Sequence, residues 1–141
     1  MAVYRSPFVN LAVETGIYAS GDALGEKNSV TLPEHGVIMA VVAQDRDKED
    51  VDFDIVMFLS DITGTTDNAA FDPTDAELNG CLGSITVTGY KDFNDNAIAT
   101  VDNVGLPYWA TDGNVYFQCV TRGTPTYTAT TDLSISFMVV H

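Results

Sequence analysis

Histidines and cysteines are few in this sequence, and their surroundings do not suggest catalysis. His35 lies in a Pro-Glu-His-Gly turn and His141 is the last residue, so neither has a serine or cysteine beside it in a nucleophile-elbow pattern. General base catalysis requires an imidazole that a partner holds in position. Cys81 and Cys119 lie in segments with strand patterns, which favours buried free thiols over a disulfide or a metal site. We therefore predict that the chain is not an enzyme.

Carboxylates are the most abundant chemical groups, and most of the 20 acidic residues are aspartates, which prefer turns and caps. The clusters Asp45–Asp50 and Asp92–Asn96 bring several oxygen ligands together, as calcium requires. Neither fits the EF-hand loop, because the second cluster has Ala97 where that loop needs glycine and Asn103 where it needs glutamate. We expect solvated acidic turns, and no metal or other cofactor.

Tyr108 and Trp109 are the aromatic residues that we expect at the surface, because Gly105-Leu-Pro107 places them near a turn. An exposed aromatic pair on a β domain can stack on sugars or anchor a protein partner. The same pair can also close one end of the domain as buried side chains. Gly21–Gly25, by contrast, lacks the lysine and the following helix of a phosphate-binding loop.

The charge balance limits the partners of this chain. It has 141 residues, with 20 acidic against 6 basic side chains and a net charge of -14. Such a field repels nucleic acid and anionic membranes, so neither is an expected partner. Because 45% of the residues are apolar, we expect one domain with a buried core. No signal peptide or apolar membrane span is evident, which predicts synthesis and folding in a cytosol.

The elements that must position these residues are strands. Short apolar or alternating segments, separated by glycine, proline and asparagine turns, predict an all-β fold: an antiparallel β-sandwich or a small, jelly-roll-like barrel. We expect the first two segments to form a hairpin around the charged cluster between them. The clearest segments are Gly36–Gln44, Val51–Ser60, Leu82–Thr88, Ala97–Val101, Val115–Arg122 and Leu133–Val140.

One short helix is expected near residues 72–79. Asp72 would be its N-cap, Pro73 its first residue and Gly80 its terminator. Asp75 would then lie in the first turn, where a negative charge favours the helix.

Two further segments are predicted to touch a partner. Val56 and Phe58 make one end of their strand apolar on both faces, so the second face must pack against another sheet or another chain. Residues 1–16 carry Tyr4, Phe8 and Leu11 without regular alternation. We therefore expect an extended N-terminal arm that is held by a neighbour, followed by a single β domain over residues 17–141.

The order of several segments along the chain resembles the layout of a known family of proteins. These segments are Tyr18–Gly25, Val37–Val42, Phe53–Leu59, Asp67–Phe71, Asp72–Asp75, Thr121–Tyr127 and Leu133–Val140. This layout resembles that of tailed-bacteriophage head structural proteins of the capsid decoration, or cement, type. The resemblance implies a virion protein on the outer capsid surface that binds the major capsid protein and stabilises the shell. It also implies copies that cluster as homotrimers about a local symmetry axis.

Two other classes of protein stay open. A carbohydrate- or receptor-binding β-sandwich of a phage tail or fibre would hold Tyr108 and Trp109 open to solvent in a groove. A calcium-dependent or hydrolytic domain would need a pocket with convergent polar groups and carboxylates of shifted pKa. A decoration protein would instead bury apolar surface against its neighbours, through Val56, Phe58 or the arm.

Overall fold

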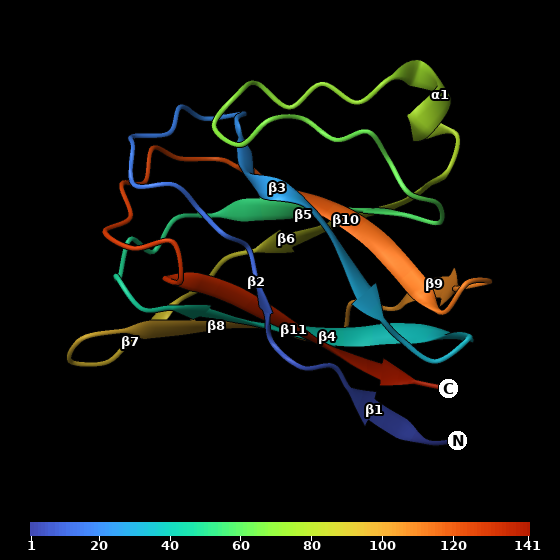
Figure 1. The fold of residues 1–141 in the computed structure, drawn as a ribbon. Coiled ribbons are helices and arrows are strands. Elements are labelled where there is room, and N and C mark those ends of the chain that lie inside the picture. Colours follow the sequence, from blue (N-terminus) through green and yellow to red (C-terminus); the bar gives the residue numbers. More distant parts are fainter.

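Two antiparallel β-sheets face each other in the structure, a computed structural model that describes residues 1–141. Figure 1 shows the sheets as two layers. The larger sheet contains β1 (Val3–Arg5), β2 (Val9–Asn10), β4 (His35–Asp45), β7 (Lys91–Asp92), β8 (Ala97–Val101), β9 (Leu106–Trp109) and β11 (Leu133–Val140). The smaller contains β3 (Ala23–Thr31), β5 (Phe53–Phe58), β6 (Cys81–Val87) and β10 (Asn114–Thr121). The predicted all-β sandwich is confirmed, and the sheets do not close into a barrel.

The strands pair in a nested order. β1 and β2 pair with β11, β3 with β10, β4 with β8, and β5 with β6. Two further pairings, β11 with β4 and β10 with β5, complete the sheets. This order is that of a jelly roll, which occurs in viral capsid domains and in lectins. Because one fold hosts many functions, the surface must distinguish between them.

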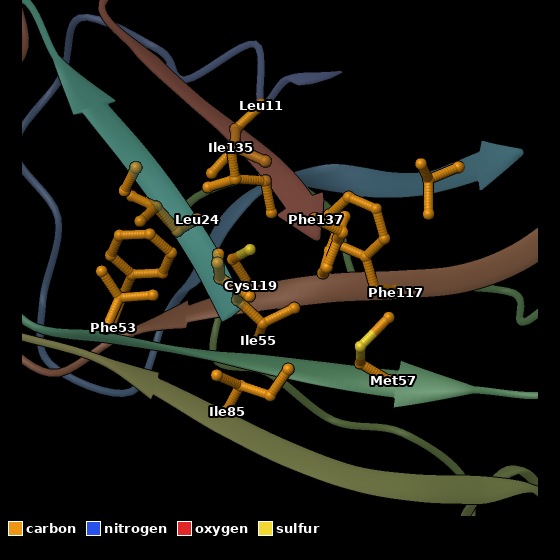
Figure 2. Close-up of a cluster of buried hydrophobic side chains, with 14 of the residues drawn as sticks. Leu11, Leu24, Phe53, Ile55, Met57, Ile85, Phe117, Cys119, Ile135 and Phe137 are labelled. Carbon is orange, nitrogen blue, oxygen red and sulfur yellow. The ribbon is translucent and has the colours of Figure 1, made fainter. Parts of the chain in front are cut away.

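The core lies between the sheets and is built from alternate strand positions. Phe53, Ile55 and Met57 of β5 are fully buried, as their period-two spacing predicts, and point between the two layers (Figure 2). The rings of Phe117 and Phe137 meet edge to face, with centroids 5.5 Å apart. Since these two rings come from different sheets, their contact joins the layers.

The expected hairpin between the first two long strands is wrong, because β4 and β5 belong to different sheets. Between them the chain crosses from one layer to the other through an acidic turn, in which Lys48 and Asp50 have left-handed backbone conformations. Asp45, at the end of β4, is fully buried, and its carboxylate accepts the N–H groups of Asp47 (3.0 Å) and Asp50 (2.9 Å). These bonds fix a crossover, which replaces the hairpin in a nested topology.

Helix α1 spans Asp75–Leu78, inside the stretch where the sequence predicts a helix, but its N-cap is Thr74 and not Asp72. The Thr74 hydroxyl accepts the N–H of Glu77 at 3.1 Å, and the Glu77 carboxylate accepts the N–H of Thr74 at 2.9 Å. This capping box satisfies two N–H groups reciprocally, which fixes the start of the helix two residues later than expected. No helix in the structure has the length and apolar character needed to cross a membrane.

Residues 1–16 do not form a separate arm, because β1 and β2 within this segment belong to the larger sheet. β1 and β2 pair with β11, and the N–H of Leu11 donates to the carbonyl of Leu133 at 3.0 Å. Leu11 and Val13 are fully buried in the core. Strands of three and two residues are too short to show the alternation that reveals longer strands. The expected division into an arm and a domain is thus corrected to one domain.

Candidate functional site

The outer side of the larger sheet carries a row of apolar side chains. In the strand register, Val3 lies opposite Val140, Val140 opposite Val37, and Val37 opposite Pro107. The row therefore crosses four neighbouring strands, β1, β11, β4 and β9. Val139, next to Val140, is fully buried in the core, and adjacent strand residues point to opposite sides, so the row faces outward.

Two larger side chains extend this row. Met39 is the extra residue of a β-bulge, because Met138 pairs with Ala40 and Val139 with Ile38. Trp109 lies two residues beyond Pro107 on the same side of β9. These residues together are called the apolar face below: Val3, Val37, Met39, Pro107, Trp109 and Val140.

The apolar face is uncovered. The exposed fractions are 77% for Val3, 53% for Trp109 and 38% for Met39. In Figure 1 no segment lies over this side of the larger sheet, whereas residues 59–80 lie over the outer side of the smaller sheet. A group of large apolar side chains that no segment of the chain covers marks an interaction surface.

The apolar face is also free of acidic side chains. β1, β2, β9 and β11 contain no aspartate or glutamate, and Asp45 of β4 is buried between the sheets. A positively charged side chain, Arg5, lies beside the face. Its guanidinium lies 5.2 Å from the ring centroid of Phe8, and its Nε donates to the Ser136 hydroxyl at 3.4 Å. In a chain of net charge -14, this sheet surface offers an apolar partner no carboxylate to desolvate.

The structure separates the predicted aromatic pair. Trp109 is on the apolar face, while Tyr108 is 2% exposed. Both lie in strand β9, where consecutive residues face opposite sides, so the expectation that both are exposed is wrong for Tyr108. The Tyr108 hydroxyl has no hydrogen-bonding partner, and burial raises the pKa of this phenol. Tyr108 thus closes one end of the core, and Trp109 alone is free to contact a partner.

The two predicted contact residues of β5 lie on the outer side of the smaller sheet. Phe58 is 1% exposed, and with Ile62 and Ala76 it lines a hollow of about 330 Å³ beneath residues 59–80. Val56 is half-buried on the same side. The second apolar face of this strand therefore packs against the chain's own loop, and the prediction that Phe58 contacts a partner is wrong.

The predicted contact residues near the N-terminus have different positions. Leu11 is fully buried in the core, which excludes it as an anchor for a partner. Tyr4 is half-buried and packs against the same core from β1. Phe8 is half-buried beneath the guanidinium of Arg5. These residues hold the edge of the larger sheet in place, next to the apolar face.

The two acidic turns come together in the fold. Partial desolvation, together with a hydrogen bond to the Asp92 carboxyl, raises the pKa of the exposed Asp50 above its ordinary value. No group of three or more His, Cys, Asp and Glu side chains has an arrangement that could hold a metal ion. The Asp45 carboxylate is already occupied by backbone N–H groups, so these acids stabilise turns.

The remaining reactive side chains are isolated. His35 is exposed beside the apolar face, where it pairs with Trp109 in the ladder between β4 and β9. Cys81 and Cys119 are free thiols, as predicted. Burial raises the pKa of the Cys119 thiol well above its ordinary value, so this thiol stays protonated at neutral pH. Neither cysteine lies beside a histidine in its strand pairing.

Sequence reasoning missed five residues of the apolar face: Val3, Val37, Met39, Pro107 and Val140. A signal was present in β4, because every residue from Val37 to Ala43 is apolar. In a two-layer sandwich only one side of a strand faces the core, so such a run leaves an apolar outer side. For Val3 no comparable signal exists, because β1 is only three residues long.

No family model, curated protein or solved structure matches the chain. The jelly-roll fold and the apolar face are therefore the features that bear on function.

Proposed function

We propose that this chain is a non-enzymatic structural protein of a phage virion, which coats the outer surface of the capsid as a decoration or cement protein and stabilises the shell. The observation that carries this proposal is the apolar face, an uncovered and acid-free sheet surface on a chain of net charge -14. Such a surface is a liability for a protein that stays alone in water, but it is buried when copies assemble into a layer.

The distribution of charge supports a place on the outside of a shell. None of the 20 acidic residues lies within the apolar face, and five of them lie in the loop over the smaller sheet: Asp61, Asp67, Asp72, Asp75 and Glu77. An acidic layer on the outside does not meet the packaged nucleic acid. It also keeps coated particles apart, because like charges repel. The major capsid protein is the shell partner in this proposal.

The experiment uses bare shells of the phage that encodes the chain. Purified chain is added in increasing amounts, the shells are sedimented, and the bound copies are counted against the major capsid protein. We expect binding that saturates at a fixed ratio and raises the temperature at which the shells break. A chain that stays in the supernatant, or that pellets without saturation, contradicts the proposal.

The exposed Trp109 favours a second candidate, the carbohydrate- or receptor-binding module of a tail or fibre. Aromatic side chains that bind sugars stack on them through an open ring face, and Trp109 is 53% exposed. The burial of Tyr108 removes the second ring that such a site would use. Because Trp109 is the single tryptophan, its fluorescence reports directly on this alternative. A saturable change on adding polysaccharide from the host surface would favour a sugar site; a decoration protein leaves the emission unchanged.

A further inference from the structure

We infer that the occupant of the apolar face is a second copy of this chain, related to the first by a two-fold axis. This inference rests on the proposed function, in which a shell holds many copies side by side. In the dimer, the apolar face of one copy covers the apolar face of the other, and the two-fold axis predicts which residues are in contact.

The apolar face is self-complementary under a two-fold axis. The strands β1, β11, β4 and β9 lie side by side in that order. A two-fold axis parallel to the strands, between β11 and β4, places β1 of one copy over β9 of the other and β11 over β4. The aliphatic row then meets an aliphatic row along its whole width. This is the self-complementarity that an isologous interface requires.

The charged side chains at the two margins of the face are complementary under the same axis. Arg5 lies at one margin of the face, in register with Met138. On the opposite margin, the N–H of Val104 donates to the carbonyl of Met39 at 3.0 Å. This bond holds the loop that contains the exposed Asp102 at the same level along the strands as Arg5. The axis brings Arg5 of each copy to Asp102 of the other. Two symmetric ion pairs thus flank an apolar centre that contains no carboxylate.

The apolar face is small for an interface between two proteins. Four strands about 4.8 Å apart and three rows of side chains about 6.8 Å apart give about 400 Å² per copy. Two copies would bury about 800 Å² together, which is below the roughly 1,200 Å² at which stable complexes begin. Pairing is therefore weak in dilute solution and forms readily where a shell holds copies at about millimolar effective concentration. A surface of this size suits contact between neighbouring bound copies.

The salt dependence follows from the net charge. Two copies of net charge -14 repel each other across all of their surface except the paired faces. Salt screens this repulsion, with a Debye length that falls to about 8 Å at physiological ionic strength. Pairing should therefore tighten as sodium chloride is added, whereas attachment of this acidic chain to a basic surface would weaken.

The experiment measures self-association of the free protein by sedimentation equilibrium, up to about 1 mM, at low and physiological salt. We expect a reversible dimer that salt strengthens, and a Trp109 fluorescence that acrylamide quenches less as the dimer forms. Arg5→Glu and Asp102→Arg should each weaken the dimer about tenfold, because each substitution opposes like charges twice. The double variant should restore it. The matched control, Ser84→Asp, adds a charge on the outer side of the smaller sheet and should leave pairing unchanged.

A native chain that stays monomeric at every concentration and salt, or a double variant that does not recover pairing, overturns the inference. Val3→Asp, at a side chain that is 77% exposed, repeats the test at a second position should an Arg5 variant lose its melting transition. If Val37→Asp abolishes attachment to shells while the native chain is monomeric, the face binds the shell and only the inference fails. If the chain dimerises as described but does not bind shells, only the proposed function fails.

Discussion

The Tyr18 hydroxyl donates a hydrogen bond to the Asp67 carboxylate at 2.7 Å and joins two segments that are 49 residues apart. The same carboxylate oxygen accepts the N–H of Gly25 at 2.8 Å, and the Tyr18 hydroxyl accepts the N–H of Glu14 at 2.9 Å. This network ties the N-terminal segment and the start of β3 to the loop over the smaller sheet. It explains how a long polar loop is held on the outer side of that sheet.

Tyr18→Phe should lower the free energy of unfolding by about 1.5–3 kcal/mol, the usual contribution of a hydrogen bond to a charged group. The matched control is Tyr116→Phe. Its hydroxyl donates to Asp112 at 2.6 Å at an exposed site, where water replaces the lost partner, so the loss should stay below about 1 kcal/mol. Urea unfolding of both variants measures the difference. Equal losses would mean that the Tyr18 bond does not hold the loop.

Tyr127→Phe should have the opposite sign, although the chemical change is the same. The Tyr127 hydroxyl is buried without a hydrogen-bonding partner, and an unsatisfied buried polar group costs about 1–3 kcal/mol. Removing it should raise the free energy of unfolding by about 1 kcal/mol. The edge-to-face contact with Tyr18, with centroids 6.3 Å apart, is retained. A lower melting temperature of the variant would contradict this reasoning.

Gly25→Ala should be far more damaging than Gly89→Ala. Both glycines have positive φ, +83° and +77°, so the conformational cost of an alanine is similar at each, about 1–2 kcal/mol. At Gly25 the added Cβ would also overlap the carbonyl oxygen of Leu11, whereas Gly89 has open space around it. We expect the Gly25 variant to lose at least about 2 kcal/mol more, through separation of Leu11 from β3. Similar melting temperatures would show that Leu11 does not pack there.

Asp50→Asn should stabilise the protein at neutral pH. Because the pKa of Asp50 is raised, the fold favours its protonated form; that contribution is present at acidic pH and is lost as the pH rises through the folded-state pKa. The neutral amide removes the repulsion from Asp92, and asparagine suits the left-handed backbone at this position. The gain should be below about 1 kcal/mol, because solvent screens this exposed group. Urea unfolding should show the gain in the free energy of unfolding at pH 7 and its decline toward about pH 4. A gain that grows on acidification would contradict this prediction.

The sequence predicts the strands better than their partners. β8 and β11 match their expected bounds, and the alternation in β5 identifies its buried side. Period-two spacing shows which way a side chain points but not which strand lies beside it. The pairing of β4 with β11, 88 or more residues later, is therefore hidden, and a hairpin with β5 is the nearest local alternative.

The apolar face shows the same limit of prediction from sequence at the level of side chains. Phe58 and Val37 each lie on strands with apolar residues on both sides, so the sequence pattern alone does not show which of them stays uncovered. The structure distinguishes them because residues 59–80 fold over Phe58, while no segment covers Val37. That loop is polar and irregular in sequence, and the bonds that hold it, such as the one between Tyr18 and Asp67, join residues far apart in the chain.

The central claim, that this chain coats a capsid with its apolar face buried, is tested most directly by image reconstruction of bare shells incubated with the chain. The account predicts added density on the outside of the shell at regular lattice positions. The jelly roll should fit this density with Val37 and Trp109 buried against a neighbouring copy. Shells without added density, or bound copies whose apolar face is open to solvent, would contradict the account.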